Sequence, residues 1–73
     1  MNKVHFIGIG GTGISAIARL LLERGIQVSG TDLHASPYFE AVTRLGALTE
    51  LGHHPELALQ ADIVVRSSAV KDD

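Results

Sequence analysis

The fold is decided by the stretch Val4-His5-Phe6-Ile7 and the turn Gly8-Ile9-Gly10-Gly11-Thr12-Gly13 that follows it. The first four residues indicate a buried strand, and the turn spells G-x-G-x-x-G. In this pattern Gly8 allows a tight turn, Gly10 lets a pyrophosphate approach the backbone, and Gly13 lets the next helix pack close to the sheet. Free N–H groups at the start of that helix favour a bound anion. The pattern therefore predicts a phosphate-binding turn.

A helix is predicted from Thr12 to Arg24, with Gly25 as its stop. Its apolar residues recur at intervals of three and four, and they are expected to face the sheet. The predicted inner face is Ile14, Ile17, Ala18 and Leu21, and the predicted outer face is Ser15, Arg19 and Glu23.

The rest of the chain continues the alternation of strands and helices. Strands are predicted at 26–30, 47–51 and 61–65, and helices at 37–45 and 55–59, the first of these capped by Ser36. This order predicts an α/β fold, a Rossmann-like doubly wound parallel sheet in three layers. Residues 1–73 are expected to form one incomplete domain, truncated after the fourth strand, which leaves that strand partly uncovered and the fragment marginally stable or self-associating.

Composition excludes several classes of function. The 73 residues carry a net charge of −2, which argues against nucleic-acid binding, and the lack of cysteine excludes disulfides and thiolate metal sites. No apolar run reaches the roughly 18 residues of a membrane span, and a cytoplasmic location is expected. The spacing of the histidines predicts no metal site. His5 is expected to be a hydrogen-bonded core residue, whereas His34 and His53 lie on predicted loops.

Polar residues at two predicted strand ends are candidates for nucleotide contacts. Asp32 follows Gly13 by nineteen residues, a spacing at which an acid holds the adenosine ribose of NAD in dinucleotide-binding domains. Alternatively, Asp32 caps its own loop through an Asx-turn. Ser67 and Ser68 end the fourth strand, where hydroxyls suit phosphate or sugar, or else cap a following helix. An NAD-binding regulatory or dehydrogenase module is thus one hypothesis for the function of this chain.

The residues His5 to Ser15 closely resemble the opening of the UDP-N-acetylmuramate–L-alanine ligases of the Mur ligase family. Further segments that fit are Val28 to Asp32, Gly52-His53 and Ser67 to Lys71, so the resemblance covers essentially the whole chain. Thr31 stands where this family more often has serine, which keeps a hydroxyl. The related ligases that recycle a murein tripeptide resemble the chain less well.

The resemblance implies an ATP-dependent, three-domain enzyme of peptidoglycan synthesis. Its first domain binds the UDP part of UDP-N-acetylmuramate, its second binds ATP and Mg²⁺, and its third accepts L-alanine. Carried onto this sequence, the diphosphate site would be Gly8, Gly10, Gly11, Thr12 and Gly13, and the uridine side would be Asp32, Ser67 and Ser68.

The 73 residues contain no G-x-x-x-x-G-K-[ST] loop for ATP and Mg²⁺. No catalytic residue is therefore assigned, no cofactor is expected in this fragment, and the chain by itself is expected to be inactive. Arg66 is a candidate for a phosphate contact or an ordinary solvated charge. The partners expected are UDP-N-acetylmuramate and the remaining domains of a longer chain, with no nucleic acid and no membrane.

Overall fold

The computed structural model describes residues 2–67, which alternate strictly between strand and helix. The strands are β1 (Lys3–Ile7), β2 (Gln27–Asp32), β3 (Leu48–Leu51) and β4 (Ile63–Arg66). The helices are α1 (Thr12–Glu23), α2 (Pro37–Arg44) and α3 (Pro55–Leu59). Every predicted element is present, with boundaries that differ by two residues or fewer.

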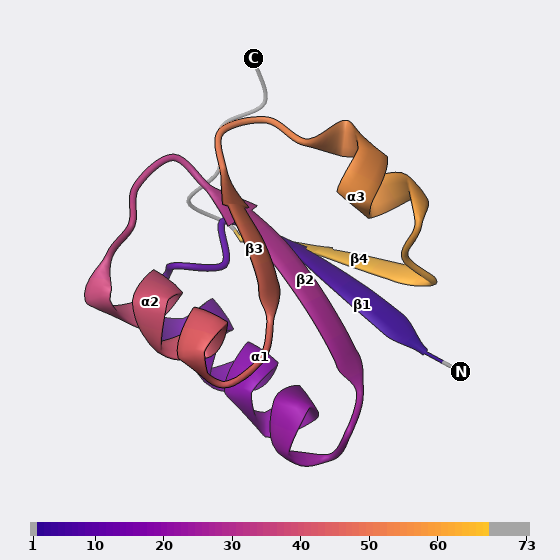
Figure 1. Ribbon diagram of the computed structural model, residues 1–73, viewed down its shortest axis with the longest axis horizontal. Helices are drawn as coiled ribbons and strands as arrows, with labels where there is room; N and C mark the ends of the chain where they lie inside the picture. Colours follow the sequence, from indigo (N-terminus) through magenta and orange to yellow (C-terminus); the bar gives the residue numbers. More distant parts are fainter. Residues whose placement is uncertain (1, 68–73) are drawn as a thin grey trace.

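The four strands form one parallel sheet in the order β3-β2-β1-β4. Helices α1 and α2 lie together on one face, and the short α3 lies on the other (Figure 1). The predicted doubly wound α/β architecture is confirmed. Because the strand order reverses between β1 and β4, the carboxyl ends of these two strands form the switch point at which such sheets bind ligands.

Helix α1 turns a different face to the sheet from the one predicted. Ala18 is fully buried and Ile14 and Leu21 pack against the core, as expected. However, Ser15 is only 3% exposed, whereas Ile17 is 51% exposed. The Ser15 hydroxyl donates to the Thr12 carbonyl at 3.1 Å, which satisfies its polar group inside the protein.

The ends of the helices follow from local chemistry. Gly25 and Gly46 have φ of 79° and 114°, the left-handed conformation that ends a helix at low cost. At the start of α2, the Ser36 hydroxyl accepts a hydrogen bond from the Phe39 N–H at 3.1 Å, and Pro37 occupies the first helical position. These predicted signals are confirmed.

His5 is a buried histidine in the middle of the sheet, as predicted. It is 1% exposed, and its Nδ1 lies 2.7 Å from the Ser29 hydroxyl on the neighbouring strand β2. Burial lowers the pKa of His5, because the charged ring would lose its hydration. The ring is therefore a neutral core residue near pH 7.

Strand β4 lies at one edge of the sheet and is only partly covered. Ile63 and Val64 are 51% and 46% exposed, which confirms the expectation that the fourth strand is partly uncovered. Within residues 2–67, no helix combines the length and the apolar character needed to cross a membrane.

Candidate functional site

The candidate site is the carboxyl edge of the sheet, meaning the strand ends and the loops that leave them. It comprises the glycine turn after β1 (residues 8–11), the end of β2 with the segment that follows it (32–36), the loop after β3 (52–54) and Ser67 after β4. The turn is fixed to β2, since the N–H groups of Gly8 and Ile9 both donate to the Thr31 carbonyl, at 2.8 and 3.0 Å. Gly8 has a φ of 85°, so its predicted role in a tight turn is confirmed.

Gly10 has a structural reason to be glycine besides the predicted approach of a pyrophosphate. A Cβ at this position would lie 2.8 Å from the Ser36 hydroxyl oxygen and 2.9 Å from Oδ2 of Asp32. The protein's own polar groups therefore fill the space that a side chain would need. The Gly10 N–H donates to Asp32 Oδ2 at 2.8 Å, and the Gly10 carbonyl accepts from Ser36 at 3.0 Å.

The predicted role of Gly13 in close helix packing is wrong, and the close approach to the sheet occurs at Gly30, where the turn meets β2. Gly13 is exposed, and a Cβ there would meet no described atom within 4 Å. A Cβ on Gly30, in β2, would collide with the fully buried side chain of Ile9. The glycine turn thus packs onto the sheet through Ile9, and the residue beneath Ile9 must have no side chain. A glycine inside a strand pattern is the sequence signal for such a close approach.

Asp32 braces the loops around it. Its Oδ1 accepts from the N–H groups of Leu33 at 2.7 Å and His34 at 3.3 Å, and its Oδ2 accepts from Gly10. The bond to His34, two residues further on, is that of an Asx-turn, which is the alternative role given above for Asp32. The additional bond to Gly10 was not anticipated. Asp32 therefore shapes the glycine turn, whatever ligand the turn holds.

Helix α1 presents an uncapped N-terminus at the switch point. Its cap residue Gly11 has no side chain to accept from the first turn, and the Gly11 N–H is used by the Gly8 carbonyl at 3.1 Å. The N–H groups of Thr12, Gly13 and Ile14 belong to the first turn, which has no carbonyl of its own helix to bind. Their partial positive charge favours an anion.

The tip of β4 lies beside this N-terminus. The Ser67 N–H donates to the Ile7 carbonyl at 2.9 Å, and the Ser67 hydroxyl oxygen is 3.8 Å from the position of a Cβ on Gly11. The structure thus brings the predicted residue Ser67 together with the glycine turn. Ser68, predicted for the same role, lies outside the described residues.

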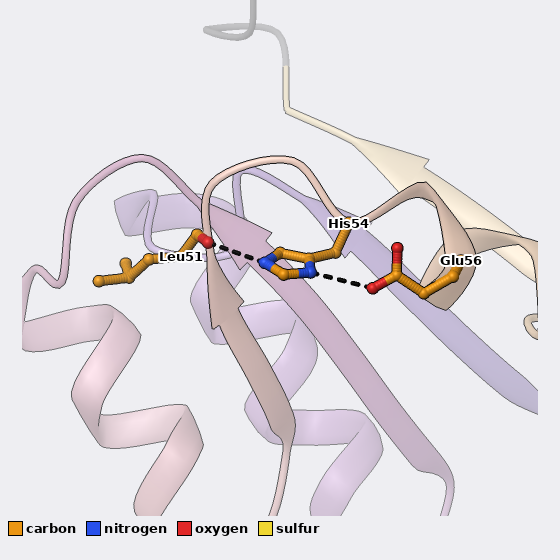
Figure 2. Close-up of polar contacts among 3 residues, drawn as sticks. All are labelled: Leu51, His54 and Glu56. Carbon is orange, nitrogen blue, oxygen red and sulfur yellow. Dashed lines mark hydrogen bonds and ion pairs between the residues drawn. The ribbon is translucent and has the colours of Figure 1, made fainter.

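Of the other candidates, His34, His53 and Arg66 are exposed, whereas Thr31 is 6% exposed. Sequence reasoning gave no role to His54, which bridges the Leu51 carbonyl and the Glu56 carboxylate (Figure 2). Nowhere in residues 2–67 do three His, Asp or Glu side chains gather as a metal site would require.

A hollow of about 390 Å³ lies at the opposite edge of the sheet, where the strands begin. Lys3, Gln27, Leu48 and Gln60 are among the residues that line it. Ligands of open α/β sheets bind at the carboxyl ends of the strands, and a phosphate needs converging donors rather than volume alone. Geometry therefore favours the carboxyl edge as the functional site.

Comparisons with known proteins identify the family and the fold. Residues 3–73 match the family described as "Mur ligase family, catalytic domain". The chain is 51% identical over 73 residues to the UDP-N-acetylmuramate–L-alanine ligase of Sulfurihydrogenibium sp. (strain YO3AOP1), covering 100% of this chain and 16% of that relative.

Two solved structures are also similar. The UDP-N-acetylmuramate–alanine ligase of Thermotoga maritima superposes with a TM-score of 0.88 at 30% identity, over 99% of this chain and 17% of its own. A murein peptide ligase from Psychrobacter arcticus 273-4 gives 0.84 at 29% identity, over 97% and 15%. The chain thus spans about a sixth of these proteins. Because the family match covers nearly every residue, this chain belongs to the Mur ligase family.

Proposed function

We propose that this chain is the N-terminal substrate-binding part of a cytoplasmic, ATP-dependent ligase that joins L-alanine to UDP-N-acetylmuramate in peptidoglycan synthesis. The observation that carries the proposal is the uncapped N-terminus of α1 beside Ser67 at the switch point of the sheet. Support comes from a relative with 51% identity that is named for this activity.

In this proposal the residues of the glycine turn have two separate tasks. Gly8, Gly10 and Gly11 shape the turn, since the N–H groups of all three already have partners in the protein. The N–H groups of Thr12 and Gly13 would bind the diphosphate of UDP, assisted by the dipole of α1.

Asp32, Ser67 and Ser68 would line the uridine side of the ligand. Oδ2 of Asp32 accepts one hydrogen bond from the protein and keeps a lone pair for a ligand hydroxyl, whereas Oδ1 already accepts two. In the longer protein, ATP bound with Mg²⁺ would supply the phosphoryl group that activates the muramate carboxylate. This chain would hold the nucleotide end of that substrate in place.

The test is a ligand-observed NMR titration of the chain with UDP-N-acetylmuramate, UDP and NAD in parallel. Preference for the two UDP ligands is expected. A preference for NAD would overturn the proposal in favour of a dinucleotide-binding module. An Asp32 substitution cannot make this distinction, because Asp32 also braces the glycine turn and its loss would weaken either ligand.

A matched pair of variants tests the position of the diphosphate. In Thr12→Glu a negative charge enters the first turn of α1, where it suits the helix dipole but repels a phosphate. UDP affinity is expected to fall by about tenfold or more. Ala16→Glu adds the same charge at an exposed position one turn further along α1, and its effect should be clearly smaller. Equal effects would contradict the proposed position.

A further inference from the structure

His54 lies in the loop after β3, directly before α3, and both of its ring nitrogens face oxygen atoms. Nδ1 is 2.9 Å from Oε2 of Glu56, and Nε2 is 3.0 Å from the Leu51 carbonyl oxygen (Figure 2). A carboxylate and a carbonyl can only accept hydrogen bonds, so both nitrogens must donate. Only the protonated ring has two N–H groups. The geometry therefore selects the imidazolium form.

The charges around the ring act in the same direction. The hydrogen bond to Glu56 is the main cause that raises the pKa of His54. Partial burial of the ring opposes this rise, whereas the bond to the Leu51 carbonyl and the charges of Glu56 on α3 and Glu50 on β3 add to it. The pKa of Glu56 is lowered in turn, first by its own backbone N–H and then by His54. The neighbouring His53 is exposed.

The loop that His54 holds is connected to the nucleotide site by hydrogen bonds. The Gly52 N–H, next to the Leu51 carbonyl, donates to the Asp32 carbonyl at 2.9 Å. The carboxylate of the same Asp32 accepts from the Gly10 N–H at 2.8 Å. A movement of the loop after β3 would thus reach the glycine turn through one residue.

We propose that His54 is a positioning residue: its imidazolium fixes the loop after β3 against Asp32, so that loss of its proton loosens the glycine turn and weakens the binding of a nucleoside diphosphate. The ligand in this inference rests on the function proposed above, whereas the coupling from His54 to Gly10 does not. Because the pKa of His54 is raised, the loop is held fully below about pH 6.5 and is released as the pH rises through the raised value.

The coupling is tested by NMR, without a ligand, between about pH 5 and pH 9. The His54 ring signals are expected to titrate above the ordinary value of 6.5, and the amide signals of Gly52 and Gly10 should follow with the same midpoint. In Glu56→Gln the midpoint should return towards 6.5. Glu40→Gln removes an exposed carboxylate on α2, has no contact with His54, and should leave it unchanged. A Gly10 amide that does not follow His54 would overturn the inference.

The effect on binding is tested with UDP-N-acetylmuramate, whose diphosphate has no group that titrates near neutral pH. Between about pH 6 and pH 9, the affinity of the unaltered chain is expected to fall by about two- to tenfold, as for the loss of one hydrogen bond. In His54→Arg the guanidinium stays charged and can donate to both oxygens, so affinity should lose most of its pH dependence.

The ligand-free titration and the binding measurement distinguish the role of His54 from the proposed function. If the unaltered chain binds the ligand equally well across this range, or if His54→Arg keeps the full pH dependence, the role of His54 in binding is refuted. If the chain binds no UDP ligand at any pH, the proposed function fails, and the titration of the Gly10 amide still decides whether His54 positions the glycine turn.

Discussion

The contact between Gly30 and Ile9 leads to a sharp prediction for Gly30→Ala. The new Cβ would meet Cδ1 of Ile9 and lie 2.7 Å from Ile9 Cβ. Rotation of the Ile9 side chain can move Cδ1 but cannot move Cβ, so the backbone of the glycine turn must shift. That turn is held by the N–H groups of Gly8 and Ile9 on the Thr31 carbonyl, and these bonds would be strained.

Overpacking of a well-packed core costs about 1–3 kcal/mol, and the upper part of this range is expected because Ile9 Cβ is rigid. A domain of this size typically has a free energy of unfolding of about 4–11 kcal/mol. A loss of about 2 kcal/mol would lower the Tm by roughly 8–16 °C. Gly30→Ala should therefore remove a large part of the stability of the fold.

The assay is urea denaturation followed by circular dichroism, with Gly13→Ala as the matched control. Gly13 lies in the first turn of α1 with open space around its Cβ position, so alanine should stabilise the helix by about 0.5–1 kcal/mol. The two variants make the same chemical change with opposite expected signs. If Gly30→Ala were as stable as the unaltered chain, or if Gly13→Ala lost stability, the assignment of the close contact to Gly30 would be refuted.

Three further predictions concern polar groups in and near the site. Asp32→Asn replaces an acceptor of the Gly10 N–H and should lower the free energy of unfolding, measured by urea denaturation, by about 1–3 kcal/mol. Unchanged stability would show that the carboxylate does not hold the glycine turn in place. Ser36→Ala removes the cap of α2 and should cost about 0.5–2 kcal/mol in the same assay, and a loss smaller than this would contradict the cap. Because burial lowers the pKa of His5, its contribution to stability is present above about pH 6.5 and is lost as the pH falls through the lowered value. His5→Gln should remove this loss from the pH dependence of Tm. If Tm decreased identically at low pH in both proteins, His5 would be excluded as the cause of the decrease.

Much of the fold could be predicted because its signals are local. A glycine in the left-handed conformation ends each long helix, at Gly25 and Gly46, and the side chain of Ser36 caps α2. These features depend on a few neighbouring residues, so the sequence contains them in full. The strand order then follows from the alternation of strands and helices, which leaves few ways to connect a parallel sheet.

The orientation of α1 could not be predicted in the same way. Apolar spacing indicates that Ile14, Ile17, Ala18 and Leu21 share a face, but the angle at which the helix meets the sheet depends on contacts with the rest of the fold. Here Ser15 points inward and Ile17 outward, after a turn in which Ile9 packs on Gly30. Periodicity within one helix contains no information about such long-range contacts.

Asp32 shows why the ligand is harder to infer than the fold. An acid at the end of the second strand is compatible with two interpretations, a ribose contact and a cap. The structure shows that its carboxylate holds Gly10, Leu33 and His34. A residue that shapes the glycine turn is needed for any phosphate bound there, so its presence cannot separate UDP from NAD. In the proposed function the discrimination must come from groups that meet the uridine, and Ser67, which lies beside the glycine turn at the end of β4, is the candidate for this contact.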